Sequence, residues 1–113
     1  MPHVIIEYTD DVVASRQARA LVDAVFDAVV SAGLFNTGNI KLRTIPIKHY
    51  RLGSDRQGFI HVQCRIRRGR SEEQKKALTT EILSAIKGLS LGVSVVTVEV
   101  IDMDAASYAK YSP

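Results

Sequence analysis

The segment FIHVQCRIRRGRSEEQKKAL, residues 59–78, decides the fold, because a strand pattern in it changes directly into the start of a helix. Apolar and polar side chains alternate over residues 59–67, which is typical of a strand with one face on a core and one face in a polar setting. Ser71 and Gln74 have the spacing of a capping box, in which each side chain binds the backbone N–H of the other. Apolar side chains at helical spacing follow over residues 78–89, and Gly88 predicts the end of the helix.

The first half of the chain has the same order of elements. Its predicted elements are a strand over residues 4–8, a helix over 13–31, a strand over 39–47 and a polar connection over 51–58. Thr9, Asp10 and Asp11 offer side-chain oxygens for the N-cap of this first helix. The second half ends with a strand predicted over residues 93–101, which is rich in β-branched residues.

The repeat is visible in the letters as well as in the pattern. Residues 17–21 (QARAL) match residues 74–78 (QKKAL), 57 positions later. The length and the repeat predict one α/β (α+β) domain over residues 1–113, built from two pseudo-symmetric β-α-β units at about 1–57 and 58–113. Two helices would cover one face of a four-stranded sheet and leave the other face for contact with other subunits.

The order β-α-β-β-α-β fits two topologies that periodicity does not separate. In one, the strands of each β-α-β unit lie side by side. In the other, the ferredoxin-like fold, the first strand lies between the third and the fourth, and many members are non-enzymatic binding modules. The alternative function is therefore a ferredoxin-like binding module.

Composition and charge narrow the class of protein. The hydrophobic share of 46% and the charged share of 24% are those of an ordinary globular domain. One cysteine, Cys64, excludes an internal disulfide, and no signal peptide or membrane-spanning run is recognisable, so we expect a cytoplasmic protein without a membrane partner. His3, His49 and His61 are too dispersed to predict a metal site.

The only concentration of charge is formed by arginines at the end of the strand over residues 59–67. They are Arg65, Arg67, Arg68 and Arg70. No aromatic residues interleave with them and no RNA-binding signature is present, so nucleic acid is not expected as a partner. Small anionic substrates suit such a cluster, and so does a solvated strand end.

The start of the chain, Met1-Pro2-His3, suggests a catalytic amine. Removal of Met1 would make Pro2 a free secondary amine, and an α-amino group titrates near pH 8 when unperturbed. Burial or nearby cations lower the pKa of such an amine, and a neutral amine at pH 7 acts as a general base. With Met1 retained, Pro2 would be an amide nitrogen without basic character.

Short segments along the whole chain carry a resemblance to known proteins: Met1-Pro2-His3, Ala32-Gly33-Leu34-Phe35, Gly38-Asn39-Ile40, Phe59-Ile60-His61 and Gly69-Arg70-Ser71. They resemble the tautomerase superfamily, and most closely the 5-carboxymethyl-2-hydroxymuconate isomerase family, which implies a role in aromatic compound catabolism. The segment Asp102-Met103-Asp104-Ala105-Ala106 is similar to macrophage migration inhibitory factor, another member. The resemblance implies the tautomerase fold and an enzyme that moves a proton without a cofactor or a metal.

The resemblance also implies the roles of particular residues. Pro2 would take a proton from a dienol and return it to carbon, and Arg70 would hold a substrate carboxylate through its bidentate guanidinium. The second arginine of the family falls on Lys41, which keeps the charge but loses the fork, and Arg43 on the same side of the strand is a candidate to replace it. Tyr108 falls where relatives have an aromatic wall of the pocket.

The expected substrate is a small di- or tricarboxylate such as a 2-hydroxymuconate, or a 2-oxo acid. Relatives form homotrimers, so we expect a trimer here, with cations of a neighbouring chain near Pro2. Phe59-Ile60 stands where a second proline would be needed, which predicts one active site per chain.

Overall fold

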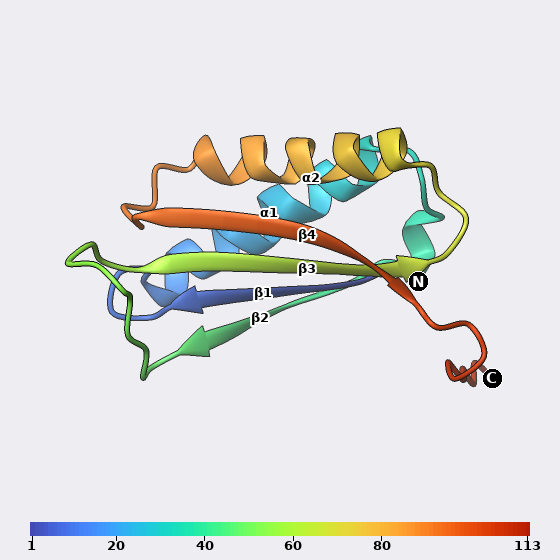
Figure 1. The fold of residues 1–113 in the computed structure, drawn as a ribbon, viewed down its shortest axis with the longest axis horizontal. Helices are drawn as coiled ribbons and strands as arrows, with labels where there is room; N and C mark the ends of the chain where they lie inside the picture. Colours follow the sequence, from blue (N-terminus) through green and yellow to red (C-terminus); the bar gives the residue numbers. More distant parts are fainter.

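The computed structural model describes all residues 1–113, and its elements follow the predicted order (Figure 1). They are β1 (His3–Thr9), α1 (Ser15–Ser31), the 3-10 turn η1 (Thr37–Asn39), β2 (Lys41–Ile47), β3 (Phe59–Arg67), α2 (Glu72–Lys87) and β4 (Val95–Met103). The last strand begins and ends two residues later than its β-branched run predicts, because β4 keeps pairing with β3 as far as Met103. None of the helices is long and apolar enough to cross a membrane.

The pairing of the strands separates the two topologies that the sequence left open. The sheet has the order β2-β1-β3-β4, in which β1 lies parallel to β2, β3 lies parallel to β4, and β1 and β3 meet antiparallel at the centre. Each β-α-β unit therefore keeps its own strands side by side. The tautomerase-like prediction is confirmed, and the ferredoxin-like alternative is wrong because β1 does not lie between β3 and β4.

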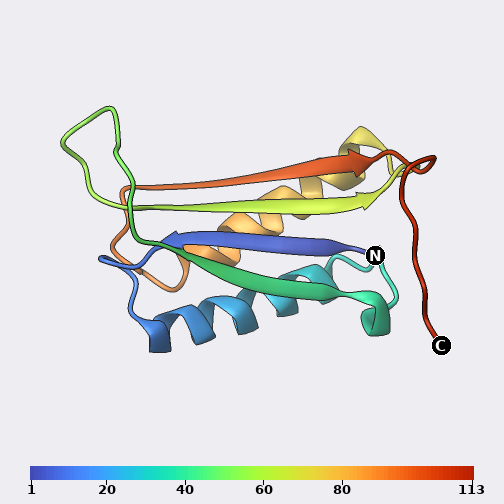
Figure 2. The ribbon, with the colours of Figure 1, turned by 90° about the horizontal axis from the view of Figure 1, so that it is seen from below.

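Both helices cover the same face of the sheet, and Figure 2 looks onto the uncovered face. The alternating side chains of β1 and β3 that point to the helices are buried and form one cluster with the apolar stripes of α1 and α2. The alternate residues of each strand form what we call the open face: His3, Ile5 and Glu7 of β1, Lys41, Arg43, Ile45 and Ile47 of β2, Phe59, His61, Gln63, Arg65 and Arg67 of β3, and Val95, Thr97, Glu99 and Ile101 of β4.

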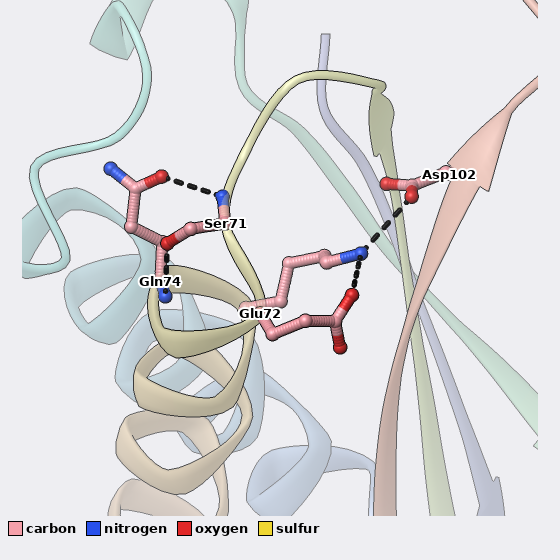
Figure 3. Close-up of polar contacts among 5 residues, drawn as sticks. Ser71, Glu72, Gln74 and Asp102 are labelled. Carbon is pink, nitrogen blue, oxygen red and sulfur yellow. Dashed lines mark hydrogen bonds and ion pairs between the residues drawn. The ribbon is translucent and has the colours of Figure 1, made fainter.

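The sequence repeat corresponds to matching helix starts. In α2, the Oγ of Ser71 accepts from the N–H of Gln74 at 3.1 Å, and the Oε1 of Gln74 accepts from the N–H of Ser71 at 2.9 Å (Figure 3). In α1, Gln17 makes the equivalent bond back to the N–H of Ala14, also at 2.9 Å. The ammonium of Lys75 adds a bond that ties α2 to β4, because it reaches Asp102 at 3.1 Å.

The predicted cap of α1 by Thr9, Asp10 or Asp11 is wrong. The helix begins at Ser15 after Ala14, and the hydroxyl of the buried Thr9 instead accepts from the backbone N–H of Phe59 at 3.1 Å. Asp11 accepts from the hydroxyl of Tyr50, so it attaches the connection between β2 and β3 to the segment that follows β1. The Thr9 contact joins the two repeat units at the end of the sheet where β1 stops, and the Asp11 contact lies within the first unit.

A glycine is required where this connection enters β3. Gly58 has a φ of +78°, and a Cβ there would lie 2.8 Å from Cγ2 of Val12 and 2.9 Å from Oγ1 of Thr9.

We expect Gly58→Ala to lower the free energy of unfolding by about 2 kcal/mol, through left-handed backbone strain and overpacking. Urea denaturation measures this change. Gly53→Ala, where a Cβ meets nothing within 4 Å, is the matched control and should stay within about 0.5 kcal/mol of the parent chain. Equal losses in both variants would contradict the assignment.

Candidate active site

Strand direction brings distant segments of the chain together at one end of the sheet. Since β1 and β2 are parallel and β3 and β4 run the opposite way, the starts of β1 and β2 lie beside the ends of β3 and β4. Figures 1 and 2 show the chain start, η1 and the C-terminal segment at this end. Every candidate site residue of the sequence analysis except Arg43 lies close to it or lines a cavity there.

The first cavity at this end has a volume of about 330 Å³ and a cationic lining. Its cations are Arg67, the last residue of β3, Arg70, which follows that strand, and Lys110 of the C-terminal segment. The remaining lining residues are Met1, Leu34, Phe35, Asn36 and Asn39, so no carboxylate lines the cavity. Such a cavity favours anionic ligands.

Arg70 is held in place by the turn that follows α1. Its Nη2 donates to the carbonyl oxygen of Leu34 at 2.7 Å, and its guanidinium lies 5.1 Å from the centre of the Phe35 ring. A cation over an aromatic face is favourable, and the planar group keeps further N–H donors for a ligand. The structure therefore places Arg70 as a fixed donor in the wall of the cavity.

The chain start lies against the same cavity. Pro2 is buried, and its carbonyl oxygen accepts from the backbone N–H of Lys41 at 3.0 Å, which fixes the start of β1 beside the start of β2. The amine of Met1 donates to the carbonyl oxygen of Asn39 at 3.3 Å, and the ammonium of Lys41 donates to the same oxygen at 3.2 Å. Lys41 thus lies beside the amine, although it does not line the cavity.

These surroundings disfavour a charged amine. Burial, followed by the positive charges of Lys41, Lys110 and Arg67, lowers the pKa of the Met1 amine from its ordinary value. The order of these causes shows that loss of water around the amine matters most and that the cations add to it. An amine at this position is therefore a stronger candidate for a neutral base than an exposed chain terminus.

A second cavity of about 290 Å³ adjoins the first. Its lining includes Tyr108 together with Arg68, Met103 and Ala105, and it shares Met1 and Arg67 with the first cavity. Tyr108 thus lines a cavity, as an aromatic wall residue would. Met1 and Arg67 therefore lie between the two cavities.

Arg43 lies apart from both cavities, on the open face. Its Nη1 donates to Nδ1 of His3 at 3.3 Å, and because a guanidinium only donates, the ring proton of a neutral His3 is on Nε2. That Nε2 lies 3.2 Å from the hydroxyl of Tyr108 and donates to it. Burial, followed by the charges of Arg43, Lys41, the chain terminus and Arg65, lowers the pKa of His3 and favours its neutral form.

Sequence reasoning missed four participants in this arrangement. Arg67 was noted only as part of a basic cluster, and Asn39 only as part of a similar segment and of a predicted strand. His3 was noted as part of the chain start and as one of three dispersed histidines, without a role in the site. Asn39 is positioned by η1, where the side chain of Asn36 accepts from the N–H of Gly38. Lys110 was not singled out at all, because nothing in the local sequence around it marks a site.

None of the cations in these cavities has a carboxylate partner. The ion pairs of the chain involve Arg19, Lys48, His61 and Lys75. Arg67, Arg68, Arg70 and Lys110 form none. Unpaired cations that face one cavity repel one another, and an anion bound among them would relieve that repulsion.

The fold agrees with that of solved isomerases. A 5-carboxymethyl-2-hydroxymuconate delta-isomerase superposes with a TM-score of 0.83 at 22% identity, over 99% of this chain and 89% of the other. A 5-carboxymethyl-2-hydroxymuconate isomerase from Deinococcus radiodurans R1 gives 0.85 at 21% identity, over 99% and 90%. The asymmetric trimer of fused wild-type 4-OT gives 0.74 at 17% identity, over 96% and 91%.

The sequence itself matches one family over most of its length. None of the curated protein sequences is similar enough to count as a match. The sequence model of the 5-carboxymethyl-2-hydroxymuconate isomerase family matches residues 2–94, which begin at Pro2 and include Arg70. The chain therefore belongs to the 5-carboxymethyl-2-hydroxymuconate isomerase family, and it is an isomerase of the tautomerase superfamily.

Proposed function

We propose that the chain is a cofactor-independent tautomerase that acts on a 2-hydroxymuconate, such as 5-carboxymethyl-2-hydroxymuconate, or on a related 2-oxo acid, with Pro2 as general base. The observation that carries the proposal is the position of the chain start in a cavity lined by unpaired cations. In this proposal Met1 is removed before the enzyme acts, and the nitrogen of Pro2 becomes a secondary amine.

The proposed reaction moves one proton and changes no oxidation state. The neutral amine of Pro2 takes the proton of the dienol hydroxyl, and the electrons of that O–H bond form the ketone. The displaced electrons of the diene move to a carbon atom, which receives the same proton back from the ammonium of Pro2. The base is regenerated, and the product is a conjugated ketone.

The position of the amine supports its role as a base. The released amine of Pro2 would lie one residue deeper than the Met1 amine, next to the same Lys41, Lys110 and Arg67 charges. In this proposal Lys41, whose ammonium donates to the Asn39 carbonyl oxygen, helps to keep the amine neutral through its positive charge. This role needs a charge but not a bidentate guanidinium, so a lysine can take the place of the family's second arginine.

The shape of the site supports a substrate with carboxylates. Arg70 would bind one carboxylate through the N–H groups that Leu34 leaves free. Because Met1 lines both cavities, its removal would join them into one larger site, with Arg70 at one side and Tyr108 at the other. Arg43 would act in this site through His3 and Tyr108, since its own donors lie on the open face.

Replacing the proposed base should remove catalysis without unfolding the chain. Pro2→Ala substitutes a primary amine of different basicity and geometry, so we expect kcat/KM for a 2-hydroxymuconate to fall by about 100-fold or more. Steady-state absorbance assays on protein with an N-terminus established by mass spectrometry measure this change. Pro46→Ala, at an exposed position near the end of β2, is the matched control and should keep its activity. Turnover unchanged in the Pro2 variant would refute the proposed base.

We also propose that the enzyme is a homotrimer. The support is the open face, which carries Val95, Ile101 and the 41% exposed Ile45 without a covering layer. Uncovered apolar patches mark interaction surfaces, and closed cyclic symmetry covers three such faces at once without leaving an open contact.

The oligomeric state tests this proposal directly. Sedimentation equilibrium at micromolar concentration should give three times the chain mass of 12.4 kDa. Ile45→Lys, on the open face, should shift the mass towards one chain because it places a charge in the interface. Val30→Lys, at a similarly exposed residue of α1 outside that face, should remain trimeric. A parent chain that is active and sediments with the mass of one chain would exclude the trimer.

A further inference from the structure

The C-terminal segment after β4 is fastened to the active-site end of the sheet. We call residues 104–113 the strap; Figure 2 shows it crossing that end of the sheet beside the chain start. The strap begins with a turn, in which the carbonyl oxygen of Asp104 accepts from the N–H of Ser107 at 3.2 Å and its Oδ1 accepts from the N–H of Ala106 at 3.1 Å. This turn directs the following residues back over the sheet end.

Tyr108, four residues after Asp104, attaches the strap to the start of β1. The hydroxyl of Tyr108 accepts from His3, and the two rings meet edge to face with centroids 6.2 Å apart. Arg43 holds His3 in the orientation that this bond requires, since its donation to Nδ1 leaves the ring proton on Nε2. The contact joins residues 105 positions apart in the sequence. It therefore fixes the path of the strap beside the chain start.

Lys110, two residues after Tyr108, lines the first cavity together with Met1. It has no carboxylate partner, and its charge is one of those that lower the pKa of the terminal amine. Neither Lys41 nor Arg43 lines this cavity. Besides Arg70, its cations are Arg67 at the end of β3 and Lys110, and Lys110 is the one that the strap supplies.

We infer that Lys110 is a specificity-determining residue that binds a second carboxylate of the substrate, and that the strap holds it there through Tyr108, His3 and Arg43. The inference rests on the proposed function, because it names how that site selects dicarboxylates over monocarboxylates. A role as a solvated tail residue would leave selectivity independent of Lys110.

Two ligands with the same carbon skeleton test the inference without any turnover. trans,trans-Muconate and sorbate are six-carbon dienes that differ by one carboxylate, and neither carries the enol that the proposed reaction needs. Titration calorimetry on protein without Met1 should give tighter binding of muconate. We expect Lys110→Gln to weaken muconate binding by about tenfold, the effect of one charge-assisted contact, and to leave sorbate binding within about twofold.

Two further variants test whether the effect is specific to Lys110 and whether it depends on the contact between Tyr108 and His3. Lys76→Gln removes an exposed charge on α2, far from the strap in sequence, and should change neither affinity. Tyr108→Phe keeps the ring but removes the acceptor for His3, so it should weaken muconate binding in the same direction as Lys110→Gln and broaden or shift the NMR signals of the strap.

The outcomes distinguish this inference from the proposed function. Muconate affinity that is unchanged in Lys110→Gln, or that falls equally with sorbate affinity, overturns the role of Lys110. A parent chain that shows no preference for muconate overturns it as well. Affinity that depends on Lys110 in a protein that does not isomerise 2-hydroxymuconates would support the inference and refute the proposed reaction.

Discussion

The pairing of β1 with both of its neighbours is the constraint on which the rest of the structure depends. β1 lies parallel to β2 and antiparallel to β3, so the start of the chain meets the turn before β2 and the arginines at the end of β3. The backbone bond from Lys41 to the Pro2 carbonyl is the first bond of this pairing at that end. It places the terminal residues beside Asn39 and the cationic cavity. A slip of one residue would turn His3 towards the helices and break its contacts with Arg43 and Tyr108.

The site follows from this pairing through electrostatics. Because of the strand directions, Arg67, Arg70 and Lys110 lie together at one end of the sheet. None of them takes part in an ion pair, since the paired carboxylates of the chain contact other cations. The unpaired charges attract anions and at the same time disfavour a protonated amine, so in the proposed mechanism one arrangement would serve both substrate binding and proton transfer. Burial strengthens both effects, because it removes the water that would otherwise screen the charges.

Much of the fold was predictable from the sequence because it depends on local patterns. Alternation in residues 59–67 and the capping box of Ser71 and Gln74 specify β3 and the start of α2, and both appear as predicted. The cap of α1 was not predictable locally, since the Thr9 hydroxyl is taken by Phe59, 50 residues away. The resemblance to a known family pointed to Pro2 and Arg70 through the segments that contain them, and to Tyr108 only by its place in the chain. Lys110 and the contact between His3 and Tyr108 depend on the path of the strap, which no short-range pattern encodes.

The central claim is that the amine at the start of β1 is neutral at physiological pH because the protein surrounds it with cations and excludes water. An ¹⁵N NMR titration of protein without Met1, labelled at proline, measures the pKa of the Pro2 amine directly. The account predicts a pKa below the value of about 8 of an ordinary α-amino group, and a rise towards that value in Lys41→Met, because loss of a nearby cation favours the protonated form. A Pro2 pKa at or above the ordinary value, or one unchanged in Lys41→Met, would contradict it.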